Sequence, residues 1–446
     1  MNRYPGVAGK MQKNIIKTLI LIPIMLALCF SFIGVKSYVA RDYLNNEGRV
    51  TLGKKFVDNN WYFFDAAGKL QTGIYDYNNK RYYSTNEGVM VSNEWITIYG
   101  KKYYVKADSS LAVGNIIING KMESFDDSGE YKGSGKMTDN LFVKFLNVGN
   151  ADCAYIKLPN GETALIDTGD VNNSSKVVSF LKEQDLKSKN GKPLIDYVIL
   201  THPHSDHMGG LTAVLDNFQV KKVYLPKITE TEDWYAGMDL TKENPDIIKS
   251  LKLDYDMYKD IVNYINKNGI ESTTTVRGQF IDENNILKFI QSDKDFEPKP
   301  IRGEALLDYW NDKSAIVYLN YGDLQVLFTG DMQWRSETDF VVNKLLNGSE
   351  VDVLKVPHHG YDTSSTIDFL RYVNPEFGVI SRSAENINLD TLKSEKGREN
   401  SAYNNLLSTG VSIYETSEKD GVSIYATEEN WNLENKKPKP SKHNFF

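Results

Sequence analysis

The stretch that decides the fold is residues 200–210, which read LTHPHSDHMGG and place three histidines and one aspartate within six residues. The preceding residues 195–200 (IDYVIL) are mostly β-formers without a helical period. Pro203 and the pair Gly209-Gly210 then force the chain out of extended pairing, so the cluster lies on a loop at a strand end. Neutral imidazole and ionised carboxylate are the usual ligands of borderline divalent ions. The stretch therefore predicts a metal site, and an accidental polar turn is disfavoured because half of the chain's six histidines lie here.

Further acidic residues and histidines follow other predicted strands in the same way. Asp167, Asp331 and the pair His358-His359 each come directly after an apolar run. In α/β architectures the catalytic groups collect at the carboxyl ends of strands. We therefore expect these residues to meet the 202–207 loop at one edge of the fold.

Together these motifs, over about residues 140–427, resemble the metallo-β-lactamase fold. The resemblance implies an α/β fold of the αββα type, with two sheets face to face, helices outside and two divalent metal ions in the groove. It implies that His202 and His204 hold one metal and that Asp206 and His207 hold the other. Asp331 would bridge them, and His358 or His359 would complete the shell. Imidazole-rich ligands favour zinc first and manganese second.

The same resemblance assigns the remaining site residues. The implied catalytic residues are Asp206, Asp331 and His359, and the paired histidine that binds no metal could protonate the leaving group. Asp167 and Asp152 would not bind metal themselves but would orient the metal-binding side chains.

One departure from the fold's usual pattern limits which branches of the fold the sequence can resemble. The usual third histidine is absent, because no histidine occurs from Met208 to Pro357. One branch without it is the domain of the competence DNA-uptake channel, which Asp152 and the motifs LIDTG (165–169), TGD (329–331) and KVPHHG (355–360) resemble. The other is the phosphorylcholine esterase of choline-containing cell walls, in which the domain is joined to choline-binding repeats.

Such repeats are predicted ahead of the hydrolase region, where aromatic, glycine and asparagine residues recur every 20 to 21 residues. Each unit indicates a short aromatic hairpin stacked on its neighbours. The units resemble the cell-wall-binding (choline-binding type) repeats of Gram-positive surface proteins, although only Trp95 keeps the indole that usually opens a unit. A stacked spacer is the alternative. The aromatic residues that could contact wall or choline are Trp61, Tyr62, Tyr82, Tyr83, Trp95, Tyr103 and Tyr104.

Composition limits the partners and the compartment. A net charge of −7 gives no general attraction to nucleic acid, which stays a disfavoured partner. The two cysteines form no disulfide framework in the folded part, because Cys29 lies in the N-terminal apolar run, and Cys153 is expected to be a buried core thiol. Basic residues precede an apolar run over 18–35, which indicates a signal peptide or a membrane-retained signal anchor.

The predicted order is a signal segment (1–37), repeats (53–134), a metallo-β-lactamase hydrolase domain (139–428) and a disordered polar tail (429–446). Residues 226–310 are interpreted as an insertion over the site, with a helix over 258–268 closed by Gly269. Candidate pocket residues in it are Trp234, Tyr235, Tyr255, Tyr258 and Trp310.

The sequence thus predicts an exported, metal-dependent phosphodiesterase acting on cell-wall or choline-bearing teichoic-acid polymers. It would be secreted or held at the surface of a Gram-positive bacterium, on the membrane if the N-terminal segment is uncleaved. One alternative is an extracellular nuclease of the competence type. An alternative of another class is a catalytically inactive wall-binding surface protein, which the intact set of metal-ligand residues disfavours.

Overall fold

The computed structural model describes residues 52–57, 59–135, 140–228, 244–296, 305–382, 401–418 and 420–435. The predicted signal segment 1–37 lies outside them. The chain divides into two compact units, residues 1–92 with 109–111, and residues 93–108 with 112–446. Across the described ranges, no helix is long and apolar enough to cross a bilayer.

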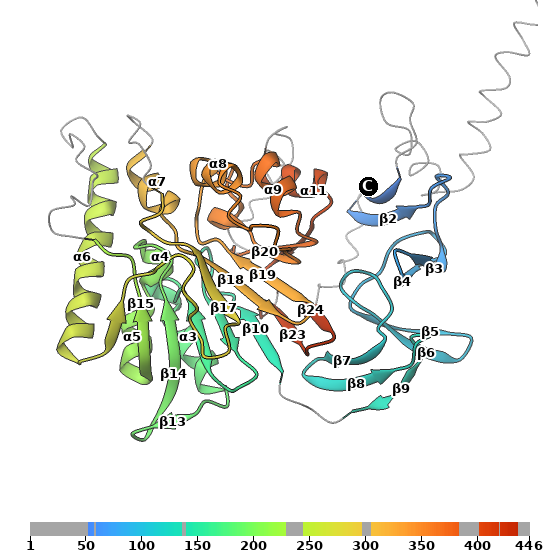
Figure 1. Cartoon of the computed structure of the whole chain (residues 1–446), viewed down its shortest axis with the longest axis horizontal. Helices are drawn as coiled ribbons and strands as arrows, with labels where there is room; N and C mark the ends of the chain where they lie inside the picture. Colours follow the sequence, from blue (N-terminus) through green and yellow to red (C-terminus); the bar gives the residue numbers. More distant parts are fainter. Residues whose placement is uncertain are drawn as a thin grey trace, which may run out of the picture. The chain divides into compact units, whose positions relative to one another are not determined.

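The first unit contains two antiparallel aromatic hairpins, as the repeat pattern predicts (Figure 1). At the tip of the second hairpin, Asn78 and Asn79 both have positive φ (46° and 61°). Tight hairpin turns need this conformation, and asparagine tolerates it well. The two hairpins are β1 (Gly53–Val57) with β2 (Asn60–Phe64), and β3 (Gly73–Tyr77) with β4 (Lys80–Ser84).

The second unit begins with further hairpins of the same kind and continues into the two-sheet domain that the sequence predicts to be a hydrolase, called the hydrolase domain below. The turn residue Asn119, at the tip between β7 and β8, donates its backbone N–H to Glu434 Oε1 at 2.7 Å. Hairpin and domain are therefore in direct contact within this unit. The strands are β5 (Glu94–Ile98), β6 (Lys101–Val105), β7 (Gly114–Ile118), β8 (Lys121–Phe125) and β9 (Tyr131–Ser134).

The hydrolase domain is built on two sheets. In the described residues, the first has the order β16-β15-β14-β12-β11-β10-β23-β24 with β13 beside β14, and the second has the order β17-β18-β19-β20-β21-β22. The first sheet comprises β10 (Leu141–Phe145), β11 (Ala154–Lys157), β12 (Thr163–Ile166), β13 (Ser188–Lys189), β14 (Lys192–Ile199), β15 (Gln219–Tyr224), β16 (Glu271–Thr273), β23 (Val422–Ala426) and β24 (Trp431–Glu434). The second comprises β17 (Leu287–Gln291), β18 (Ile316–Tyr321), β19 (Leu324–Phe328), β20 (Val353–Lys355), β21 (Phe377–Ile380) and β22 (Ser412–Glu415).

The two sheets pack face to face because alternate residues of each strand are apolar on the inner side. Phe145 of β10 stacks on Phe328 of β19 across the interface, with ring centroids 5.6 Å apart. In β12, Ala164 and Ile166 face this inner core, whereas Leu165 faces outward into a second core beneath helices. The predicted αββα sandwich is confirmed.

Helices cover both outer faces (Figure 1). On the first sheet lie α3 (Ser174–Lys182), α5 (Leu211–Asn217) and α6 (Pro245–Lys267). On the second lie α8 (Trp334–Val342), α9 (Ile367–Val373) and α11 (Ala402–Ser408). The shorter elements are η1 (Val171–Asn173), α4 (Ser205–Met208), α7 (Ala305–Asp312) and η3 (Pro357–Gly360).

Two expectations about element bounds are wrong. The insertion helix begins at Pro245 rather than at residue 258, because Asn244 caps it and proline suits the first turn. The same insertion supplies an edge strand to each sheet, β16 and β17, for which the sequence analysis makes no prediction. The tail after residue 429 is not wholly disordered, since β24 pairs with β23 and buries Leu433.

Candidate metal centre

The site lies where strands of the two sheets end. Asp167 follows β12, the histidine loop follows β14, Asp331 follows β19, and the pair His358-His359 follows β20. Because β12 and β14 run parallel, as do β19 and β20, their carboxyl ends meet at common edges. The placement predicted from the sequence is therefore observed.

Backbone hydrogen bonds fix the histidine loop against the segment after β12. Thr168 donates its N–H to the His207 carbonyl at 2.7 Å, and Gly210 donates to the Gly169 carbonyl at 3.0 Å. Gly210 lies so close to this segment that a Cβ on it would be 2.1 Å from the Thr168 oxygen. The loop therefore requires glycine at this position.

Four of the predicted ligands form one cluster. The ligand atoms of Asp206, His207, Asp331 and His359 all lie within 4.8 Å of one another. Asp331 Oδ2 is 3.2 Å from Nε2 of both His207 and His359, and Asp206 Oδ2 is also 3.2 Å from His359 Nε2. Asp206 is half-buried, and the other three residues are buried. Asp331 thus lies between the two imidazoles, as the bridging role would require.

Both histidines of the cluster are oriented by bonds from their other nitrogen. His207 Nδ1 donates to Asp167 Oδ2 at 2.8 Å, and His359 Nδ1 donates to the Ser381 carbonyl at 3.0 Å. Asp167 also accepts from the N–H and the hydroxyl of Thr201, each at 2.8 Å. Such bonds leave Nε2 of each ring to face the cluster.

A buried ion pair lies behind the cluster. Lys355 Nζ is 2.6 Å from Asp152 Oδ2, and both residues are buried. Asp152 Oδ1 is 3.5 Å from His359 Nδ1. Asp152, Asp167 and His207 also approach one another closely, but the Lys355 ammonium already supplies the positive charge there. The sequence predicts a supporting role for Asp152 but none for Lys355. The feature that could have indicated Lys355 is its position as a charged residue at the end of the apolar strand β20.

His202 and His204 form a second pair beside the cluster. His202 Nε2 lies 3.0 Å from His204 Nδ1, and its Nδ1 lies 3.1 Å from the hydroxyl of Thr201. The His202 and His207 ring centroids are 4.1 Å apart. Burial first, and then the neighbouring histidines, hold the pKa of His202 well below its usual range, so this ring is neutral.

His358 does not belong to the cluster. Its Nδ1 lies 2.6 Å from Thr363 Oγ1, and its Nε2 lies 3.3 Å from Asn311 Nδ2. Burial lowers its pKa. The structure therefore brings His359, and not His358, to the other ligands.

The chemistry of the cluster fits divalent metal ions. Burial lowers the pKa of His359, but Asp331 and Asp206 outweigh it and raise the value to about 10. Burial also opposes the charge on His207, and three carboxylates again raise its pKa well above the usual range. Without another cation, protons on these rings must balance the buried carboxylates.

Several buried polar atoms at the site also make no hydrogen bond with the described residues. Among them are His204 Nε2 and Asp331 Oδ1. Such atoms are costly unless a ligand completes them. The set of imidazole and carboxylate donors therefore fits the predicted metal centre.

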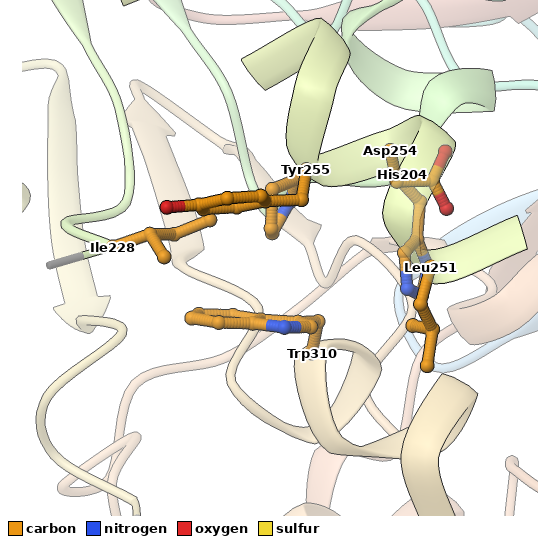
Figure 2. Close-up of a pocket in the computed structure, with 7 residues that line it drawn as sticks. His204, Ile228, Leu251, Asp254, Tyr255 and Trp310 are labelled. Carbon is orange, nitrogen blue, oxygen red and sulfur yellow. The ribbon is translucent and has the colours of Figure 1, made fainter. Parts of the chain in front are cut away.

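A small pocket adjoins His204 (Figure 2). Figure 2 shows the rings of Tyr255 and Trp310 one above the other, with Asp254 on the His204 side. Asp254 Oδ1 accepts from the Ser205 N–H at 3.1 Å. Of the predicted pocket residues, Tyr255 and Trp310 line this pocket, whereas Tyr258 is buried and donates its hydroxyl to the Pro226 carbonyl at 2.6 Å. Trp234 and Tyr235 lie outside the described residues.

The aromatic residues of the repeats differ in exposure. Tyr62, Tyr103 and Tyr104 are buried in hairpin cores. The half-buried residues are Trp61, Tyr82, Tyr83 and Trp95. The buried cysteine Cys153 is a core thiol, as predicted, and burial raises its pKa.

Comparison with known families agrees with this geometry. The model of the family described as the metallo-beta-lactamase superfamily matches residues 146–383. The chain belongs to the metallo-beta-lactamase superfamily. Its hydrolase domain is also related to ComE operon protein 3 of Bacillus subtilis (strain 168), with 22% identity over 263 residues, which is 55% of this chain and 28% of that protein. The chain therefore spans less than a third of that relative's length.

The repeats are similar to segments of two solved structures from Streptococcus pneumoniae. Choline binding protein F matches at 30% identity over 20% of this chain and 30% of that one, with a TM-score of 0.19. The choline binding domain of Spr1274 matches at 35% identity over 18% of this chain and 95% of that one, with a TM-score of 0.17. Scores this low describe a local similarity of hairpins and assign no ligand to this metallo-beta-lactamase superfamily member.

Proposed function

We propose that this protein is an exported metal-dependent phosphodiesterase that acts on cell-wall or teichoic-acid polymers. The observation that supports the hydrolase assignment most is the convergence of Asp206, His207, Asp331 and His359 where strands of the two sheets end. The donor set favours two divalent ions, zinc first and manganese second. When bound, such ions supply polarisation of the phosphoryl group and a water of lowered pKa.

The protein's own residues would hold that chemistry in place. His207 and His359 are proposed to bind through Nε2, since Asp167 and the Ser381 carbonyl already engage their Nδ1 atoms. Asp331 is proposed as the bridging ligand because it faces both rings at 3.2 Å. His202 and His204 are proposed for the other metal. Asp206 is the half-buried residue of the cluster, so we propose that substrate approaches the cluster from the side of Asp206.

The pocket beside His204 is proposed to hold the part of the substrate next to the phosphoryl group. Ile228, Leu251 and Tyr255 give it an apolar wall, and Asp254 gives it one carboxylate. Burial raises the pKa of Asp254. Such a lining suits a small group without negative charge better than a second phosphate.

The repeats support a wall polymer as substrate, because they present half-buried aromatic side chains ahead of the hydrolase domain. The protein is accordingly proposed to be secreted or surface-held, with residues 1–37 as a signal peptide or anchor and 53–134 as the wall-binding part. The second candidate is an extracellular nuclease, which the KVPHHG motif and the relation to ComE operon protein 3 favour. The net charge of −7 opposes it.

The test is hydrolysis by the full chain, with zinc or manganese, of bis-(p-nitrophenyl) phosphate, p-nitrophenyl phosphorylcholine and linear DNA. We expect turnover of the phosphodiesters that Asp331→Ala abolishes. The matched control is Asp323→Ala in the exposed turn between β18 and β19, which should keep wild-type activity. Preference for the choline ester would support the wall substrate, and preference for DNA would support the nuclease. No turnover of any substrate would overturn the enzyme assignment.

A further inference from the structure

Three rings of the second unit form an aromatic cage on the hairpins. The centroids of Trp95 and Tyr131 are 5.0 Å apart with planes at 81°, and those of Trp95 and Phe125 are 5.7 Å apart with planes at 28°. Phe125 and Tyr131 complete the triangle at 5.6 Å. Trp95 and Tyr131 are half-buried, and Phe125 is buried beneath them. The cage is therefore only partly buried.

The cage already holds a cation from the same chain. Lys102 Nζ lies 3.8 Å from the Trp95 ring centroid and 4.8 Å from that of Tyr131. Both distances are well within the range of cation–π attraction, which comes from the negative electrostatic potential of the ring face. Lys102 is exposed, so water and dissolved cations can reach the contact.

Strand register places the lysine there. Trp95 is paired with Tyr104 and Thr97 with Lys102, so Trp95 and Lys102 are diagonal neighbours on one face of the hairpin. The adjacent Lys101 is engaged differently, in an ion pair with Glu130 at 2.7 Å. The position of Lys102 over the rings therefore follows from the fold of this hairpin and is not shared by its neighbour.

We propose that Lys102 is the resident cation of the Trp95–Phe125–Tyr131 cage and closes it to external quaternary ammonium groups. One ring face accommodates one cation, so the ammonium of Lys102 and a choline headgroup compete for Trp95. The first unit has a similar lysine–tryptophan contact, with Lys54 Nζ 4.7 Å from the ring centroid of Trp61. These repeats would then contact the wall by other means until the lysine is displaced.

The test is equilibrium dialysis of the full chain with labelled choline, which does not depend on hydrolase activity. Lys102→Ala should bind choline about two- to fivefold more tightly than the wild type, which corresponds to the 0.5–1 kcal/mol typical of an exposed cation–π contact. Lys102→Arg keeps a cation over the rings and should bind as the wild type does. Lys101→Ala is the matched control and should leave choline binding unchanged.

A second substitution assigns the gain to this cage. Adding Trp95→Leu to Lys102→Ala should remove the added affinity. Equal choline affinity of wild type and Lys102→Ala, a gain in Lys102→Arg equal to that in Lys102→Ala, or no choline binding by any variant would each overturn the proposal.

Discussion

Gly210→Ala is a one-methyl change that tests whether the histidine loop must lie where it does. The added Cβ would stand 2.1 Å from the Thr168 carbonyl oxygen, whereas ordinary contacts begin at 3.4 Å. Both partners are backbone, so no flexible side chain can move aside. The loop and the segment after β12 must therefore separate by about 1 Å or more, the scale at which misplacement becomes costly for catalysis.

The separation breaks the bonds that hold His207 in place. Thr168 contacts the His207 carbonyl through its N–H at 2.7 Å and its hydroxyl at 3.0 Å. A displacement of this size at a catalytic centre costs about 10²-fold in rate. Overpacking adds about 1–3 kcal/mol of lost stability. We expect Gly210→Ala to lose most of its bound metal and about 10²-fold in phosphodiester turnover.

The assay measures metal per chain, turnover and the thermal midpoint of the full chain. Thr212→Ala is the matched control, because Thr212 is exposed two residues further on and its truncation adds no atom. Metal content and turnover of Gly210→Ala within about twofold of the control would refute the reasoning that this contact positions the site.

Three further predictions follow from buried charges. Lys355→Met leaves Asp152 without its 2.6 Å partner and should lower the free energy of unfolding, measured by urea denaturation, by about 3–5 kcal/mol. Adding Asp152→Asn should restore much of that loss, and a loss below about 1 kcal/mol in Lys355→Met would contradict the prediction. Asp167→Asn should weaken metal binding by about 10–100-fold in a chelator titration, because it no longer orients His207 with a carboxylate, and unchanged affinity would count against that role. Burial raises the pKa of Glu337 from 4.5 to about 7, so the folded chain holds this proton more tightly than the unfolded chain. The stability it contributes, about 3 kcal/mol, is complete below the unfolded pKa and is lost as pH rises through the folded value. The thermal midpoint of Glu337→Gln should therefore fall less between about pH 5 and about pH 8 than that of the wild type, and parallel profiles would argue against the shift.

Much of this site can be predicted from the sequence, because the ends of the strands can be recognised in it. Asp167, Asp331 and His359 each follow a short apolar run, and parallel pairing brings such ends together. The choice of His359 over His358 could not be predicted. Both residues have positive φ, 48° and 50°, and only the fold decides which ring meets Asp331.

Contacts between distant segments also could not be predicted from the sequence. The pair Lys355–Asp152 joins β20 to the turn before β11, and nothing local marks either side chain as the other's partner. Strand β24 is not predicted for a related reason. Leu433 stands among polar residues and becomes buried only because β24 pairs with β23. Tertiary context decides such short strands.

The central claim is that the buried histidine and aspartate cluster is a metal centre bridged by Asp331. Elemental analysis of the full chain, loaded with zinc and dialysed, tests it most directly when wild type is compared with Asp331→Asn. The account predicts about two ions per wild-type chain and a clear loss in the variant, because the bridging carboxylate contacts both imidazoles. Absence of bound metal from the wild type, or equal content in both proteins, would contradict it.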